Sequence, residues 1–285
     1  MSKLYDLESR YRAGRDSLDF FDCNAWIGRP PDPGFWTPAD ADELLAYLCS
    51  CGVRRAVLSH LATRDYDPSA GNEILLDAVA TRDDCVAAVV LTPEMAWHVG
   101  EQGTGNREQK KGKTFLDIDA RLDDYIRRKA RMVRLFPRSH NFSLSGWCSG
   151  GLLDAISERR MPLILWHTET NWETVERICG QYPDLPVVVE GTPRKILYDN
   201  RLFYAAMERR PNLYLELHNL INYLGLEDMV SRFGAGRLLY GSYMPICDPN
   251  AVTMMVTEAR IPAEEKTRIA SGNLEELLAG VRVPS

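Results

Sequence analysis

The chain has 285 residues, of which 45% are hydrophobic and 26% are charged, a balance typical of a soluble globular protein. Its formal net charge of −6 argues against a nucleic-acid partner, which would require a basic surface. The longest uninterrupted apolar runs, such as Cys85–Leu91, are too short to cross a bilayer, so we expect no membrane partner.

The amino-terminal segment and the cysteines indicate a cytoplasmic protein. The first ten residues lack the apolar core of a secretory signal. The seven cysteines are scattered without C-x-x-C spacing, which is typical of reduced thiols. The basic run Arg127–Arg131 is interpreted as the solvated end of a helix and not as a phosphate-binding surface.

Short apolar runs alternate with helical patterns along the whole chain. Runs rich in Val, Ile, Leu and aromatic residues predict eight strands: Phe20–Asn24, Arg55–Ser59, Cys85–Leu91, Met132–Phe136, Leu163–His167, Pro186–Glu190, Asn212–His218 and Arg237–Gly241. The stretches between them predict helices over Ala41–Cys51, Asn72–Arg82, Asp117–Ala130, Gly151–Arg160, Trp172–Gly180, Ile196–Arg209, Glu227–Phe233 and Asn250–Ala259. Eight alternations without a break in composition predict an α/β fold, a (β/α)₈ TIM barrel formed by a single domain over residues 1–285.

Local signals support several of these boundaries. Thr37 is the expected N-cap of the first of these helices, with Pro38 at its first position and Gly52 after its end. A short closing helix is expected over Ala270–Leu278. No G-x-G-x-x-G or Walker sequence follows the first strand, which argues against a nucleotide cofactor.

The longest irregular stretch is residues 92–114, which contain four glycines and follow the third strand. Loops of this length are uncommon in compact domains unless they are functional or disordered. In a barrel, the loop after a strand lies at the catalytic face. We therefore expect a lid loop near residues 92–114.

Active sites of barrels are built from residues at the carboxyl ends of the strands, and side-chain alternation selects those that face the lumen. On the first strand, Phe20, Asp22 and Asn24 are expected to share that face, with Trp26 just beyond them, and Trp166 is expected to point away from the lumen. The remaining polar or aromatic candidates at strand ends are Arg134, His167, Glu190, Glu216, His218 and Tyr243.

Several blocks in the right order resemble the amidohydrolase-2 branch of the metal-dependent amidohydrolases, which includes decarboxylases and lactonases. The four clearest blocks are Phe21-Asp-Cys-Asn-Ala-Trp-Ile-Gly28, Met132-Val-Arg-Leu-Phe-Pro137, Pro162-Leu-Ile-Leu-Trp-His167 and Arg237-Leu-Leu-Tyr-Gly-Ser-Tyr-Met-Pro245. This resemblance covers nearly the whole chain and implies the amidohydrolase barrel, with its ligands at the strand ends.

The departures from this family fall on the metal ligands themselves. The first strand of the family reads Asp-x-His-x-His, whereas Asn24 and Trp26 occupy the two histidine positions here. Tyr243 replaces the aspartate that serves as a ligand and base, and Glu190-Gly191 replaces a His-Gly pair. Of the usual set, only His167 remains. An indole N–H cannot bind Zn²⁺, so the resemblance predicts no bound metal and no cofactor.

A different metal site is the alternative. His167, Glu190, Glu216 and His218 are chemically sufficient to hold a zinc ion if they converge. A purely structural role is the other interpretation of the same residues. Glu190 and Glu216 are hard to bury without a partner, and Arg134 is the expected partner in a structural ion pair.

Two functional hypotheses follow. The first is a hydrolase or related lyase that acts on a small, anionic ester, lactone or carboxylate substrate without the usual metal. His167, Glu190, Glu216 and Arg134 would be its catalytic residues, and Asn24, Trp26, His218 and Tyr243 would bind the substrate. The second is a catalytically inactive barrel used as a binding or assembly module. A homo-oligomer is compatible with either hypothesis.

Overall fold

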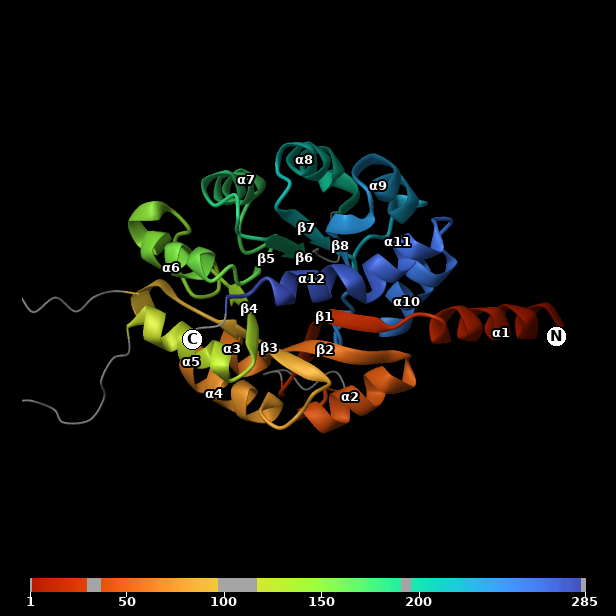
Figure 1. Ribbon diagram of the computed structural model, residues 1–285, viewed down its shortest axis with the longest axis horizontal. Helices are drawn as coiled ribbons and strands as arrows, with labels where there is room; N and C mark the ends of the chain where they lie inside the picture. Colours follow the sequence, from red (N-terminus) through yellow and green to blue (C-terminus); the bar gives the residue numbers. More distant parts are fainter. Residues whose placement is uncertain (1, 30–36, 97–116, 191–195, 283–285) are drawn as a thin grey trace, which may run out of the picture.

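The computed structural model describes residues 2–29, 37–96, 117–190 and 196–282. Its core is one sheet of eight parallel strands in the order β1 to β8, which confirms the predicted (β/α)₈ barrel (Figure 1). The strands are β1 (Phe20–Ile27), β2 (Val53–His60), β3 (Cys85–Val90), β4 (Ala130–Leu135), β5 (Leu163–Trp166), β6 (Val187–Glu190), β7 (Leu213–Glu216) and β8 (Leu238–Leu239). Backbone hydrogen bonds close the ring between β1 and the segment after β8, from Cys23 N–H to Tyr240 O at 3.0 Å and from Trp26 N–H to Met244 O at 2.8 Å.

Most of the helices pack around the outside of the strands, whereas α1 (Ser2–Asp16) projects from the barrel and α12 (Asn273–Ala279) lies across one end of it (Figure 1). The others are α2 (Ala41–Ser50), α3 (Leu61–Asp65), α4 (Pro68–Val79), α5 (Ile118–Arg127), α6 (Gly146–Glu158), α7 (Trp172–Gln181), α8 (Ile196–Arg209), α9 (Gly225–Phe233), α10 (Pro249–Glu258) and α11 (Ala263–Thr267). Helix α1 was not predicted; it is mostly polar and extends from the barrel beside α10, where Tyr11 donates to Asn250 Oδ1 at 2.8 Å (Figure 1). None of the helices among the described residues has the length and apolar character needed to cross a membrane.

The start of α2 corrects one expectation. The N-cap is Asp40 and not Thr37, because the Asp40 carboxylate accepts the Glu43 backbone N–H at 3.0 Å. A side-chain acceptor near the third helical N–H satisfies one of the donors left free at a helix start. The Pro38 ring therefore lies before the helix and not at its first position.

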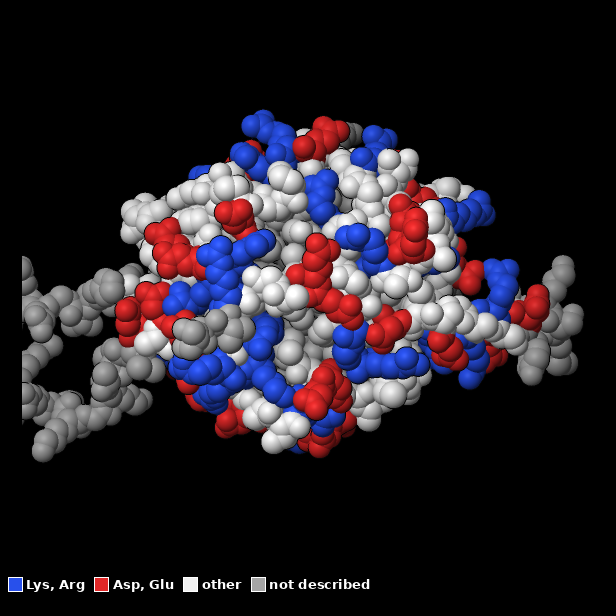
Figure 2. All heavy atoms as spheres, viewed as in Figure 1, with Lys and Arg blue, Asp and Glu red and all other residues white. Residues whose placement is uncertain are grey.

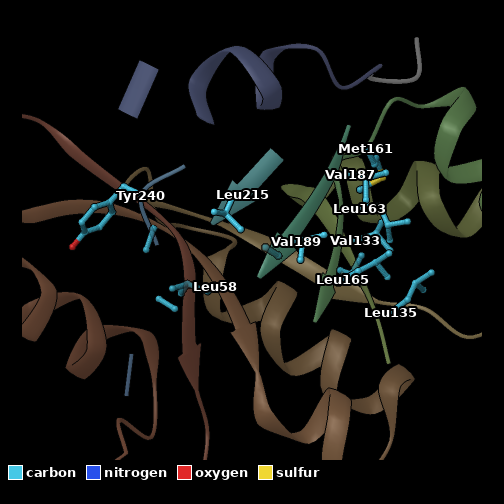
Figure 3. Packing of buried hydrophobic residues seen from close by; sticks show 14 of the residues in the cluster. Leu58, Val133, Leu135, Met161, Leu163, Leu165, Val187, Val189, Leu215 and Tyr240 are labelled. Carbon is cyan, nitrogen blue, oxygen red and sulfur yellow. The ribbon is translucent and has the colours of Figure 1, made fainter. Parts of the chain in front are cut away.

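Alternate residues of each strand pack outward against the helices. Leu58, Val133, Leu163, Val187 and Leu215 belong to this layer, in which side chains from neighbouring strands lie against one another (Figure 3). Each side chain is fully or almost fully buried. This layer is the main hydrophobic core and fixes which residues remain to face the lumen.

The amino-terminal half of the lumen is filled with apolar side chains. Its members are Phe21, Cys23, Val57, Ala88, Met132, Ile164, Val188 and Leu239, and α12 adds Leu274 and Leu277. In Figure 1, α12 lies across this end of the ring of strands. On the same face, acidic and basic side chains are interspersed (Figure 2). The amino-terminal end of the barrel is therefore closed by packing.

The first strand departs from simple alternation. Between Asp22 and Ala25, three residues of β1 advance against two of β2, Ala56 to Leu58, as in a β-bulge. The prediction that Phe20, Asp22 and Asn24 share one face is therefore wrong. Phe20 packs outward against Tyr240, with ring centroids 4.7 Å apart.

Candidate active site

Four strand ends meet at the guanidinium of Arg134, which alternation on β4 correctly directs into the lumen. Its Nε donates to Ser59 Oγ of β2 at 2.8 Å, Nη1 to Glu190 Oε1 of β6 at 2.7 Å, and Nη2 to Asn24 Oδ1 of β1 at 2.8 Å. The side chains of Arg134 and Glu190 are only 1% and 2% exposed. Charge-assisted bonds of this kind are among the strongest hydrogen bonds in proteins.

Asn24, Glu190 and Trp26 close the same network. Asn24 Nδ2 donates to Glu190 Oε2 at 2.7 Å, and Trp26 Nε1 donates to Asn24 Oδ1 at 2.9 Å. The Arg134 guanidinium lies over the Trp26 ring, 4.8 Å from its centroid. Both oxygens of Glu190 and all three nitrogens of Arg134 thus have partners within the protein.

A second acid–base pair lies at the end of β7. Glu216 accepts the His218 backbone N–H at 2.8 Å and forms a hydrogen bond with His218 Nδ1. The His218 ring stacks on Tyr243, with centroids 4.8 Å apart. Gly241 permits this arrangement, because a Cβ there would lie 2.3 Å from Glu216 Oε1.

The other nitrogen of His218 is distinctive. Nε2 is buried, and it has no hydrogen-bond partner among the residues that the structure describes. Burial by itself lowers the pKa of His218, but the charge and hydrogen bond of Glu216, with Glu190 and Asp22, outweigh this effect and raise the pKa above its usual value. His218 therefore combines a raised pKa with a buried nitrogen that has no partner among the described residues.

Asp22 joins β1 to the segment after β8. Its Oδ1 accepts the backbone N–H groups of Asn24 at 2.8 Å and Ser242 at 3.0 Å, and its Oδ2 accepts the Ser242 hydroxyl. Burial raises the pKa of Asp22 to about 6, although these hydrogen bonds oppose the shift. Repulsion from Glu216 adds to the increase.

An aromatic layer covers the polar network. Trp26, Leu61, Val90, Phe136 and Tyr243 form a buried apolar cluster against which Trp166 packs. We refer to these six residues as the aromatic cap. Burial raises the pKa of the Tyr243 hydroxyl to about 12, with the Glu190 charge adding to it. The cap contacts both polar networks, since the Trp26 ring lies against Arg134 and the Tyr243 ring lies against His218.

His167 does not join these groups. On β5, Leu163 and Leu165 face the helices and Ile164 faces the lumen, so Trp166 points toward the mouth and His167 away from it. The His167 ring stacks on Trp172 of α7 at 6.3 Å. The predicted orientations of Trp166 and His167 are therefore both reversed. The prediction assigned Leu163 and Leu165 to the lumen, whereas Ile164 faces it.

The remaining predicted residues converge. Asn24, Trp26, Arg134, Glu190, Glu216, His218 and Tyr243 all lie at the mouth, in the two networks or in the aromatic cap. The sequence reasoning missed Ser59, Ser242 and Arg64. Ser59 follows Val57 by two residues on β2, and Val57 faces the lumen, so alternation along the strand predicts that Ser59 faces it too. The expected lid near residues 92–114 lies mostly outside the described residues.

Arg64, on α3, is the more accessible cation at this end of the barrel. Its side chain is 22% exposed and pairs with Asp65 at 2.7 Å. The guanidinium lies 5.8 Å from the centroid of the Trp26 ring and interacts with the Tyr243 hydroxyl. A partly exposed guanidinium at the edge of the aromatic cap can meet an incoming anion.

The donor set does not suit a divalent metal. The Glu190 carboxylate already binds Arg134 and Asn24, and a cation beside it would lie next to a buried guanidinium. Within the described ranges, no three His, Cys, Asp or Glu side chains are grouped as metal ligands would be. In the alternative pool, the Glu190 carboxylate is bonded to Arg134 and Asn24, and the His167 ring stacks on Trp172.

The chain matches no protein-family model and no curated protein sequence. Solved structures share its fold. A dihydroxybenzoic acid decarboxylase from Polaromonas sp. JS666 with bound manganese superposes with a TM-score of 0.67 at 13% identity, covering 92% of this chain and 97% of that one. An amidohydrolase from Burkholderia multivorans gives 0.65 at 14% identity over 94% and 100% of the two chains. An uncharacterized TIM-barrel protein from Bordetella bronchiseptica gives 0.64 at 20% identity over 92% and 99%. The chain therefore shares the TIM-barrel fold of these proteins.

Proposed function

We propose that this protein is a hydrolase or lyase that acts on a small anionic substrate, a carboxylate, ester or lactone, at the carboxyl end of its barrel. Similarity in fold to decarboxylases and amidohydrolases supports this class of reaction. The observation that carries the proposal is the buried Nε2 of His218, which has no hydrogen-bond partner in the described part of the chain. Unsatisfied buried polar atoms are rare in proteins and call for an explanation, of which a reacting partner is one.

Glu216 and His218 are the acid–base pair in this proposal. A base or acid whose second nitrogen is held by a carboxylate has a fixed tautomer and orientation. The charge and hydrogen bond of Glu216 raise the pKa of His218, which shifts the imidazole toward its protonated form. A group that holds a proton suits decarboxylation, in which the C–C bond breaks and a proton from Nε2 takes the place of the departing CO₂ on carbon.

Arg64, and not Arg134, is the proposed receptor for the anionic group of the substrate. All three nitrogens of Arg134 are already bonded to Ser59, Glu190 and Asn24. Arg64 also has a partner, since its Nε and Nη2 donate to Asp65, but it retains partial exposure next to Tyr243. Tyr243 stacks on His218, so an anion at Arg64 would lie on the side of the aromatic cap nearest the acid–base pair. Access to Nε2 then requires Tyr243 to move.

The test is turnover of a panel of aromatic carboxylates, lactones and esters by the purified protein and by single variants. His218→Asn should lower any activity found by about 100-fold or more, the usual contribution of a general acid or base. Glu216→Gln should lower kcat, and Arg64→Met should mainly raise KM. His167→Asn, which changes a histidine away from the network, should stay within about twofold.

Circular dichroism melts of each variant distinguish loss of chemistry from loss of fold. If His167→Asn abolishes turnover while folded His218→Asn retains it, the assignment of the acid–base pair is wrong.

One observation favours the second hypothesis, a non-catalytic binding or assembly module. Trp26 and Tyr243 are 2% and 7% exposed and fill the space above the polar network. A permanently filled mouth needs no substrate. Absence of turnover across the panel, together with unchanged ring mobility of Tyr243 by NMR when small carboxylates are added, would support the module.

A further inference from the structure

The mouth of the barrel contains a cation that belongs to the chain. In the described part of the chain, the buried acidic, basic and histidine side chains all lie at or beside this end. They are Asp22, Arg134, Glu190, Glu216 and His218. Three of them are acids. Burying acids without a positive partner is strongly unfavourable, so the mouth requires at least one internal cation.

Arg134 meets this requirement by geometry. Arg134 lies near the end of β4 and donates hydrogen bonds to residues of three other strands, Asn24, Ser59 and Glu190. It also stacks on Trp26, so it has bonds around its edge and an aromatic ring on one face. A side chain held in this way acts as the centre of a coordination shell whose ligands come from β1, β2 and β6.

We infer that Arg134 is a resident cation that organises the mouth of the barrel as a bound metal ion would, and that its guanidinium occupies a preformed site for a planar cation with N–H donors. The inference does not depend on the proposed activity, because it concerns what holds the strand ends together. It follows that chelators should leave the protein intact and that removing the guanidinium should leave an empty site of matching shape.

Chemical rescue tests this inference directly. Arg134→Ala leaves the Glu190 carboxylate buried without its cationic partner, so the unfolding temperature should fall by about 10 °C. Guanidinium chloride at roughly 20 mM should restore at least half of that loss, at a concentration far below its denaturing range. Equal sodium chloride or MnCl₂ should restore none, because neither ion offers planar N–H donors.

Arg131→Ala is the matched control on the same strand. Arg131 donates to the carbonyls of Ile126 at 2.7 Å and Ala130 at 2.8 Å, outside the mouth. Any loss of stability in this variant should not respond to guanidinium. The wild type, treated with EDTA, should keep its unfolding temperature within about 1 °C, a small shift for a chain of this size.

A second variant covers failure of Arg134→Ala to fold. Replacing both partners, as Arg134→Met with Glu190→Met, removes the buried charges together and should recover most of the stability lost in Arg134→Met alone. The inference is overturned if manganese rescues Arg134→Ala as well as guanidinium does, if EDTA destabilises the wild type, or if the double variant is no more stable than Arg134→Met.

Discussion

The two ends of the lumen are built from the same eight strands but by opposite means. At the amino-terminal end, Phe21, Met132, Ile164 and Val188 pack with α12 into an apolar plug. Two residues further along β4 and β6, Arg134 and Glu190 form a buried ion pair at 2.7 Å. Apolar side chains at this end would give equal or greater stability, because buried ion pairs seldom add net stability. Net stability alone therefore does not account for the charged end.

The largest expected effect comes from breaking the charged end. Glu190→Ala removes the partner of Arg134 and of Asn24 Nδ2 and should lower the free energy of unfolding by about 3–5 kcal/mol. Glu190→Gln should not rescue it, because Arg134 and Asn24 donate to different carboxylate oxygens and the amide nitrogen would face one of these donors. Urea denaturation measures both variants. A loss for Glu190→Ala no larger than that for Ile164→Val, about 1 kcal/mol at the apolar end, would contradict the comparison.

A second prediction concerns pH. The pKa of Asp22 is raised to about 6 in the folded protein, above its unfolded value of 3.8. The folded state therefore binds the proton more tightly, so this contribution is fully present below pH 3.8 and is lost as pH rises through 6. The loss should be about 3 kcal/mol at 1.36 kcal/mol per unit.

Asp22→Asn should flatten this part of the pH profile, because an amide does not titrate. The fold should be kept, because the amide oxygen can still accept the backbone N–H groups of Asn24 and Ser242. His218, whose pKa is also raised, changes stability in the same direction at higher pH and should remain in the variant. Urea melts between pH 4 and 8 measure both profiles. Parallel profiles for the two proteins would remove Asp22 from the explanation.

The smallest of these effects is expected from crowding. Gly241→Ala brings a Cβ to 2.3 Å from Glu216 Oε1, so the Glu216–His218 pair must shift. Overpacking of this kind costs about 1–3 kcal/mol. Gly146→Ala is a suitable control, because a Cβ there meets no atom within 4 Å. Gly241→Ala should lower the unfolding temperature more than Gly146→Ala does. Equal unfolding temperatures would mean that the Glu216–His218 pair can shift without cost.

Much of the fold followed from local pattern. Alternation of strand and helix predicted the barrel, and the parity of Val188 with Glu190 and of Tyr214 with Glu216 directed both carboxylates to the mouth. The same logic failed on β1 and β5. On β1 a bulge changed the register between Asp22 and Ala25, and on β5 the short strand gave no internal sign of which residue faces outward.

The sequence by itself determined the architecture and most of the residues at the mouth, because hydrophobic periodicity and the rule for strand ends are local properties. Only the tertiary structure decided how those residues are used. It paired Arg134 with Glu190, Asn24 and Ser59, stacked the His167 ring on Trp172, and left His218 Nε2 without a partner among the described residues. These outcomes depend on register shifts and on contacts between residues as far apart in the chain as Asn24 and Glu190, which no local pattern contains.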